Sequence, residues 1–381
     1  MPSHQGLSDE QNALLDLVRD IARREIAPNA DEWERAATFP RAAFEALGKA
    51  GLLGLVYPEE YGGGAQPNWV YLLALEELAA AMLAVGLGAS VQTLTIFPTH
   101  AFGTSEQKDA WMPPAIAGEW IGSYCLSEPG SGSDAAALTT KAERDGDAYV
   151  ISGRKAFVTH GGDADYYMVF ARTGDAGPGG ISCIFVPAST SGVSREKLEH
   201  KMGMRSSPTA AMVFDGARVP ATNVLGAEGE GFKIAMQALD GGRLGIAACS
   251  VGLARCALDA AVAFASERQQ FGQPLLKFEG LSFMLADMAT QIEAARTLTL
   301  DAARRRDAGV PYSKHAAMAK LFASDTAMRV TTDAVQVHGG YGYVEEFPVE
   351  RYMREAKVLQ IVEGTNQIQR VVIGRHLGKQ E

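Results

Sequence analysis

The stretch Tyr166-Tyr-Met-Val-Phe170, followed closely by Ile181-Ser-Cys-Ile-Phe-Val186, decides the fold class. Both runs, like Tyr149-Val-Ile-Ser152 before them, are rich in aromatic and β-branched residues and are bounded by Gly, Asp and Pro, which is typical of short β-strands. Between residues 121 and 225 such runs stand too close together for helices to lie between them. The pattern therefore favours a small antiparallel barrel or sandwich over a parallel α/β sheet.

Helical periodicity flanks this region on both sides. Ser8-Asp-Glu-Gln11 has the pattern of a capping box that begins a helix, and we expect Pro28 to end that helix. Further helices are expected at residues 41–50, 68–85, 88–102, 105–117, 229–268, 279–309, 311–339 and 364–378. The sequence thus predicts an all-α domain (1–119), an antiparallel β-barrel domain (120–225) and a C-terminal four-helix bundle (226–381). No Gly-x-Gly-x-x-Gly follows a strand, which argues against a nucleotide-binding βαβ fold.

Charge and composition exclude several classes of function. The net charge of −10 opposes binding to nucleic acid or to anionic membranes. The four cysteines are scattered and have no histidine at metal-ligand spacing, so we expect reduced thiols and no metal. Residues 1–6 have no basic or apolar leader, and no later run offers some twenty uninterrupted apolar residues. We therefore expect a cytoplasmic protein that does not span a membrane.

Three segments carry residues suited to ligand binding. In Tyr124-Cys-Leu-Ser-Glu-Pro-Gly-Ser-Gly-Ser-Asp134, glycines and serines offer backbone amides and hydroxyls to a polar ligand, although a surface turn has the same composition. Phe157 and Thr159 share one strand face on which a planar cofactor could stack, or they are ordinary strand residues. In Leu239-Asp-Gly-Gly-Arg-Leu-Gly245, three helical glycines each cost about 1 kcal/mol relative to alanine, so a ligand or a neighbouring helix must need the space.

Three further segments lie at helix ends. Arg268-Gln-Gln-Phe-Gly272 and Gln336-Val-His-Gly-Gly340 each close a helix at glycine, as many helices do for structural reasons alone. In Ile361-Val-Glu-Gly-Thr-Asn-Gln367 a carboxylate follows an apolar pair and precedes a helix whose N-cap would be Thr365. Apolar surroundings would raise the pKa of Glu363 and make it a competent base.

Together these segments resemble the acyl-CoA dehydrogenases in order and spacing over nearly the whole chain. The resemblance implies an FAD enzyme in which Glu363 removes the α-proton while hydride passes from the β-carbon to the flavin. Expected FAD contacts are Tyr124, Cys125, Leu126, Ser127, Gly132, Ser133, Phe157, Val158, Thr159, Arg268, Phe271, Gln336, Val337, Gly339, Gly340, Thr365, Asn366 and Gln367. Expected acyl-CoA contacts are Ser90, Leu94, Ser133, Asp240, Gly241, Gly242, Arg243, Gly364 and Arg375.

The resemblance also implies partners. Arg268 and residues 336–340 are similar to positions that reach the cofactor across a subunit interface, which implies a homotetramer built as a dimer of dimers. Reduced flavin would pass its electrons to an electron-transferring flavoprotein. Two alternatives remain open, namely a flavin oxidase of the acyl-CoA or nitroalkane type and a catalytically silent flavin-binding scaffold. Oxygen consumption would identify the oxidase, and a colourless protein would favour the scaffold.

Departures from the family pattern bear on the base and the substrate. Some relatives carry the catalytic base at the position of Gly242. Glycine has no side chain that could accept a proton, so Glu363 is assigned as the base. Glu279 stands where relatives often have glutamine and is left out of the cofactor set. Val362, in place of a frequent tyrosine, should widen the site beside the base for a branched acyl group.

The expected size of the acyl group is small. Other segments resemble the short-chain and isobutyryl-CoA enzymes, and the helix at 88–102 corresponds to the floor of the acyl pocket. Ser90 and Leu94 would face that pocket one turn apart. Val91, Ile96 and Phe97 are bulky, so we expect the pocket to end early and to favour acyl groups of four or five carbons.

Overall fold

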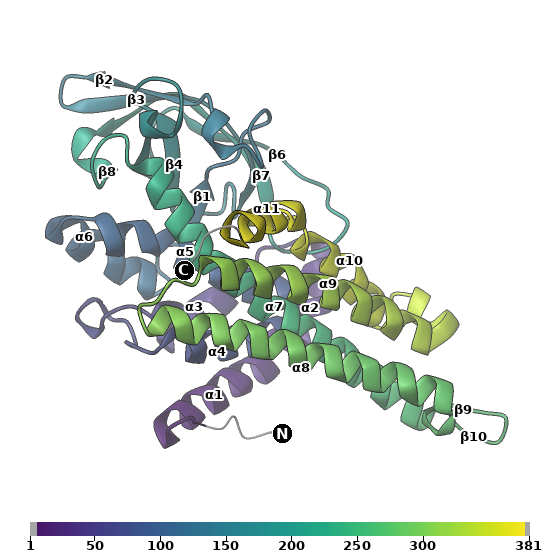
Figure 1. The fold of residues 1–381 in the computed structure, drawn as a ribbon. Coiled ribbons are helices and arrows are strands. Elements are labelled where there is room, and N and C mark those ends of the chain that lie inside the picture. The colour runs from purple at the N-terminus through teal and green to yellow at the C-terminus, as the bar shows by residue number, and fades with distance from the viewer. Residues whose placement is uncertain (1–5, 378–381) are drawn as a thin grey trace.

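The computed structural model describes residues 6–377 and confirms the expected order of helices, strands and helices (Figure 1). The N-terminal α-helices are α1 (Asp9–Ile21), α2 (Ala30–Ala36), α3 (Arg41–Lys49), α4 (Asn68–Ala81), α5 (Leu83–Phe102) and α6 (Ser105–Ile116). Helices α1 and α6 both begin at capping boxes, in which the hydroxyl of Ser8 or Thr104 accepts a hydrogen bond from the backbone N–H three residues later. These helix starts follow directly from local sequence.

Two helix boundaries differ from the sequence-based expectation. Pro28 does not end the helical path, because it stands in a 3-10 turn (Ala27–Asn29), where its missing N–H is tolerated, and α2 continues to Ala36. Conversely, the expected helix at 68–85 is broken at Met82, whose extended backbone (φ −160°, ψ 117°) separates α4 from α5. Met82 is buried, so this break has no glycine or proline signal and is set by tertiary packing.

The middle region forms one mixed sheet of eight strands. The strands are β1 (Gly122–Cys125), β2 (Lys141–Asp145), β3 (Ala148–Thr159), β4 (Tyr166–Arg172), β5 (Ile181–Pro187), β6 (Val193–Leu198), β7 (Thr209–Pro220) and β8 (Val224–Leu225). Their order is β6-β7-β3-β2-β4-β5-β8, with β1 also paired to β4. The three runs that decided the fold class lie in β3, β4 and β5, of which β4 and β5 are buried over nearly their whole length.

The expected closed antiparallel barrel is wrong in two respects. The edge strands β6 and β8 are not paired with each other, so the sheet stays open. Strand β8 has only two residues before the chain leaves to start a helix, which is too short to supply a closing ladder. In addition, β1 runs parallel to β4. Such non-local pairings are not visible in the alternation of single strands.

The C-terminal region is helical, as expected. Its helices are α7 (Gly231–Glu267), α8 (Glu279–Asp307), α9 (Ser313–His338), α10 (Val349–Leu359) and α11 (Asn366–Leu377), and a short hairpin of β9 (Gln269–Gln270) and β10 (Gln273–Pro274) joins α7 to α8. Three long helices lie side by side in Figure 1, and both α10 and α11 pack on α9. Helix α10 was not among the expected helices, although Val349, Ala356 and Leu359 recur at helical spacing on its buried face, which they share with Arg351 and Glu355.

Helix α7 is long and apolar enough by composition to cross a membrane, alone among the helices of residues 6–377. In the fold, 61% of that apolar window is buried inside the protein. Its apolar residues face α4, α5, α8 and α9, as the central helix of a packed core would.

One hydrophobic core joins the two helical regions. It runs from Leu15 in α1 to Leu359 in α10 and includes the buried faces of α4, α7, α8 and α9. A separate core lies inside the sheet around Tyr149, Val169 and Phe214. The N-terminal and C-terminal helices therefore form a single packed body, to which the sheet is attached.

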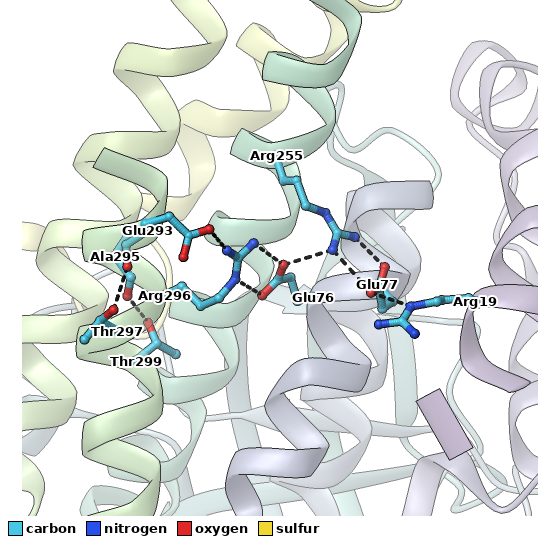
Figure 2. Close-up of polar contacts among 9 residues, drawn as sticks. All are labelled: Arg19, Glu76, Glu77, Arg255, Glu293, Ala295, Arg296, Thr297 and Thr299. Carbon is cyan, nitrogen blue, oxygen red and sulfur yellow. Dashed lines mark hydrogen bonds and ion pairs between the residues drawn. The ribbon is translucent and has the colours of Figure 1, made fainter. Parts of the chain in front are cut away.

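A buried ion-pair network crosses that helical body (Figure 2). Arg296 of α8 donates two hydrogen bonds to Glu76 of α4, from Nε to Oε2 (3.0 Å) and from Nη2 to Oε1 (2.7 Å). Arg255 of α7 lies 3.1 Å from the same carboxylate and also pairs with Glu77, which Arg19 of α1 binds from the other side. Four helices are thus connected by charges, and Glu76 is only 3% exposed.

Candidate active site

Glu363 lies in the tight turn that joins α10 to α11. Its backbone is left-handed (φ 51°), and so is that of Gly364 (φ 89°). The turn ends at Thr365, whose hydroxyl accepts a hydrogen bond from the N–H of Ile368 (3.3 Å) and caps α11 as expected. A left-handed glutamate is uncommon, and strained backbone of this kind concentrates at functional sites.

The carboxylate of Glu363 is buried and has no hydrogen-bond partner among residues 6–377. Burial raises the pKa of Glu363 to about 7, although the charges of Lys320 and Arg243 act in the opposite direction. A carboxyl group whose pKa is near neutrality can accept a proton at physiological pH, and its two free oxygens leave room for a proton donor. These are the properties of a general base.

The three glycines of α7 leave space for side chains of this chain. A Cβ added to Gly242 would lie 1.9 Å from Oε2 of Glu363, and one added to Gly245 would lie 2.0 Å from Oγ of Ser90. At Gly241 the nearest atom would be Nη1 of Arg306, at 2.5 Å. Gly242 is therefore required for the carboxylate to approach α7, and the space is filled by protein rather than left empty.

Several expected substrate-binding residues surround this carboxylate. Gly242, Arg243 and Gly364 lie beside Glu363. Ser90 of α5 packs against Gly245, one helical turn further along α7. Arg243 is buried and pairs with Asp240, which also accepts a hydrogen bond from Ser313 (2.9 Å). The structure also buries Leu94, and it leaves Ser133 and Arg375 exposed.

The expectation that Ile96 limits the acyl pocket is wrong. Successive residues of a helix are rotated by about 100°, so Ile96 faces away from Ser90, while Leu94 shares its face. Accordingly, Ile96 packs in a cluster with Met112 and Tyr166, between α6 and the sheet. Its size cannot set the length of the acyl pocket.

Phe157 is presented to solvent by a bulge in β3. Between the pairs Lys155–Met212 and Val158–Ala210, two residues of β3 face one of β7, and Phe157 adopts a left-handed backbone (φ 54°). Its side chain is 73% exposed, whereas Val158 next to it points into the sheet. An exposed aromatic residue held by a strained strand suits stacking against a planar ligand.

A buried ion pair fixes the loop of residues 124–134 beside this strand. Lys155 Nζ donates to Glu128 Oε1 (2.8 Å) and to the carbonyl of Leu126 (3.2 Å). Burial alone would raise the pKa of Glu128, but the Lys155 ammonium outweighs it and lowers that pKa to about 2. The same lysine thus anchors the loop to β3, which sequence reasoning missed.

The residues of this region fit a flavin. A Cβ added to Gly130 or Gly132 would meet nothing within 4 Å, so the loop is open to a ligand, and Ser133 is exposed beside them. Cys125, Val158 and Asn366 have buried side chains, so their contacts with a cofactor would come from the backbone. Together with exposed Phe157, this surface offers a stacking ring and backbone polar groups.

The remaining expected cofactor residues lie at the far end of the C-terminal helices. Arg268 stacks on Tyr341, with its guanidinium carbon 5.4 Å from the ring centroid, and Phe271 is 93% exposed. They border an open pocket of about 490 Å³ lined by Phe264, Arg268, Gln270, Leu275, Val337, His338, Gly339, Gly340, Tyr341 and Val344. Gln336 is exposed near this pocket.

The structure does not bring the two groups of cofactor residues together within one chain. Lys320, beside Glu363, and His338, in the distal pocket, are both in α9, whose rise of 1.5 Å per residue separates them by about 27 Å. This arrangement is compatible with a cofactor site shared between subunits.

Two buried residues beside Glu363 were missed in the sequence. Lys320 occupies a core position of α9, in line with Ala316, Ala323 and Ala327. Tyr71 of α4 is buried close enough to Glu363 that, beyond the larger effect of burial, the carboxylate raises its pKa. A lysine on an alanine stripe was a visible signal, since buried lysines are rare and usually paired.

The family models match three consecutive segments of the chain. The acyl-CoA dehydrogenase N-terminal domain matches residues 8–119, the middle domain matches 123–217 and the C-terminal domain matches 229–378. Among relatives, an acyl-CoA dehydrogenase of Bacillus subtilis is 46% identical and covers 97% of this chain and 98% of its own length. A mitochondrial isobutyryl-CoA dehydrogenase of Dictyostelium discoideum is 41% identical over 99% of this chain and 91% of its own.

Solved structures agree in fold. Butyryl-CoA dehydrogenase from Megasphaera elsdenii has a TM-score of 0.96 and 43% identity, with full coverage of both chains. A chain from the structure of the electron transferring flavoprotein of Acidaminococcus fermentans has a TM-score of 0.97 and 46% identity, covering 99% of this chain and 100% of that one. With this similarity over its full length and a buried glutamate at the centre of its site, the chain belongs to the acyl-CoA dehydrogenases, a family of oxidoreductases.

Proposed function

We propose that this protein dehydrogenates short acyl-CoA thioesters, branched ones included, to trans-2-enoyl thioesters, with bound FAD and with Glu363 as the base. The observation that carries the proposal is the buried, unpartnered carboxylate of Glu363 against Gly242. A family enzyme that had lost its activity would have no reason to keep a charged group there, because burying an unpaired carboxylate is unfavourable.

The chain's own residues have distinct roles in this reaction. Glu363 removes the proton from the α-carbon of the thioester, and its backbone N–H stabilises the negative charge that develops on the thioester oxygen. Residues 124–133 and 157–159 hold the flavin, and residues 365–367 contact it from the helical side. When bound, the flavin supplies the hydride acceptor for the β-carbon. Burial of the carboxylate excludes water from the proton transfer.

The space beside the base supports a small acyl group. Tyr71 and Tyr124 are both large, and both lie close enough to Glu363 to feel its charge. On α5, Phe97 shares the face of Ser90 two turns further along. Bulky residues around the carboxylate leave room for a short chain, and Val362 in the same turn leaves room for a branch.

We expect the fastest flavin reduction with acyl-CoAs of four or five carbons, including isobutyryl-CoA and 2-methylbutyryl-CoA, and a steep loss by eight carbons. Each accommodated methylene adds about 0.8 kcal/mol of transfer free energy until further carbons overpack the pocket. The measurement is flavin bleaching under anaerobic conditions with a panel of chain lengths. Faster reduction by octanoyl-CoA than by butyryl-CoA and isobutyryl-CoA would contradict the short pocket, though not the reaction class.

Electrons are proposed to leave through an electron-transferring flavoprotein. Support comes from the similarity of this chain to one found in the structure of such a flavoprotein. An oxidase on the same fold is the second candidate. Rapid peroxide formation with acyl-CoA and no added acceptor would favour the oxidase.

We also propose that the subunits form a tetramer in which Arg268 and residues 336–340 serve the cofactor of a neighbouring subunit. Large apolar side chains are exposed around this end of the helices, among them Phe271, Tyr343 and Val344. Such a cluster is unfavourable in water unless a partner covers it.

Replacing Arg268 by alanine is expected to lower flavin retention and loosen the oligomer together, since one charge is proposed to serve both. Flavin content and sedimentation should fall in step. Arg154→Ala, which removes a half-exposed arginine of β3 paired with Glu196, is the control and should change neither. If Arg268→Ala also changes neither, Arg268 is only a helix-end residue.

A further inference from the structure

Lys320 of α9 is a fully buried lysine directly beside the catalytic turn. Its side chain is 0% exposed, and Nζ donates to the carbonyl oxygen of Gly364 (3.0 Å) and to Oδ1 of Asn366 (2.9 Å). Both acceptors belong to the turn that carries Glu363. The cation is therefore bound to the residue that follows the base and to the residue that starts α11.

Neutral and charged groups hold the rest of the turn. Asn366 donates to Ser324 Oγ (2.9 Å) and to Asp325 Oδ1 (2.8 Å), while Gln369 donates to the Gly364 carbonyl (2.7 Å). This set of bonds fixes backbone that would otherwise leave the left-handed conformation of Glu363 and Gly364. Arg370 also donates to the backbone carbonyl of Asn366 (3.2 Å), but among these contacts of the described turn Lys320 alone carries a charge that acts on Glu363.

We propose that Lys320 is a positioning residue for proton abstraction: it fastens the Gly364 carbonyl so that the Glu363 carboxylate stays against Gly242, and its charge favours the ionised form of that carboxylate. This inference rests on the proposed role of Glu363 as base. It adds a second residue to the machinery, one that acts through the base and touches neither substrate nor cofactor.

The electrostatic surroundings of Glu363 support this role. The titratable and charged groups that face it are Lys320 from α9, Arg243 and Cys249 from α7, Tyr71 from α4 and Tyr124 from β1. The two cations are the only groups among them that favour the carboxylate, and Lys320 has the larger effect on its pKa. Burial lowers the pKa of Lys320 to about 8, so the ammonium persists at neutral pH.

Two substitutions separate the charge from the hydrogen bond. Lys320→Met removes both, whereas Lys320→Gln keeps an amide that can donate to the Gly364 carbonyl. Ser324→Ala is the matched control, because it removes a neutral hydrogen bond from Asn366 and leaves the charge in place. All three are compared with the wild type as holoenzyme, by the pH dependence of anaerobic flavin reduction with butyryl-CoA.

Without the nearby cation, the carboxylate should stay protonated to higher pH, so the acidic limb of the profile should move upward by about one pH unit or more in both Lys320 variants. The rate should recover partly at high pH. Ser324→Ala should leave the midpoint unchanged. A midpoint that does not move in either Lys320 variant would overturn the proposal and leave Lys320 as a packing residue.

A second measurement does not depend on turnover. In protein freed of flavin, hydrogen exchange of residues 361–369 should accelerate in Lys320→Met and stay near the wild-type rate in Lys320→Gln. Equal exchange in wild type and Lys320→Met would show that the lysine does not hold the turn. Failure of the proposed function gives a different result. In that case Glu363→Gln would reduce flavin at the normal rate, both with Lys320 present and with Lys320 replaced.

Discussion

Replacing Glu363 by glutamine is expected to slow flavin reduction by acyl-CoA about 10²- to 10⁴-fold while flavin content and acyl-CoA affinity stay near normal. Glutamine has the size of glutamate but cannot accept the α-proton, so only the proton transfer is lost. Stopped-flow bleaching of the flavin measures the rate, and Glu143→Gln, at an exposed position of β2, is the matched control. Near-normal bleaching in Glu363→Gln would overturn the assignment of the base.

The same variant should be more stable than the wild type above neutral pH. The pKa of Glu363 rises from its ordinary value of 4.5 to about 7 on folding, so the ionised carboxylate opposes folding increasingly between these values and fully above pH 7. Removing it should raise the free energy of unfolding at pH 8 by up to about 3 kcal/mol. A gain in stability with a loss of activity would separate the chemical role of Glu363 from any folding defect.

Replacing Arg296 by methionine is expected to destabilise the protein by about 3–5 kcal/mol, because Glu76 then stays buried with only Arg255 as a partner. Figure 2 shows that Arg296 supplies two of the bonds that reach this carboxylate. Denaturant unfolding of the holoenzyme, with a fixed flavin concentration, measures the change. Methionine fills a similar volume, so the loss reports on charge rather than on a cavity.

Arg305→Met, on the same helix, is the control. Arg305 pairs with Asp301 at the surface, and both side chains are about half exposed, so its loss should change stability by less than about 1 kcal/mol. If Arg296→Met is no more destabilising than Arg305→Met, the buried network does not hold α8 against α4.

The features that sequence predicted well are local ones. The capping box at Ser8, the helix end at Gly339 and the cap at Thr365 each depend on a few neighbouring residues. The turn position of Glu363 is also a local feature, because the Gly-Thr pair that follows it predicts the turn. Its chemical significance, however, required the resemblance to a family, because an isolated glutamate in a turn is usually solvated.

The features that sequence could not predict are set by distant parts of the chain. The open sheet follows from which strands become neighbours, and the break at Met82 from packing between α4 and α5. Helix α10, by contrast, was open to prediction, because Val349, Ala356 and Leu359 recur at helical spacing beside the buried Arg351 and Glu355. Lys320 was visible as a lysine on an alanine stripe, but its role depends on Gly364 and Asn366, which come from a distant part of the chain.

The single core shared by the first and last helices constrains the order of events during synthesis on the ribosome. Helix α4 is apolar on most sides, and several of its contacts are with α7 and α8, which are translated more than 150 residues later. Until then the apolar surface of α4 is accessible to chaperones. The sheet, whose core lies within residues 125–219, can already fold. A chain that ends at residue 225 should therefore show hydrogen-exchange protection in β3 and β7 but little in α4.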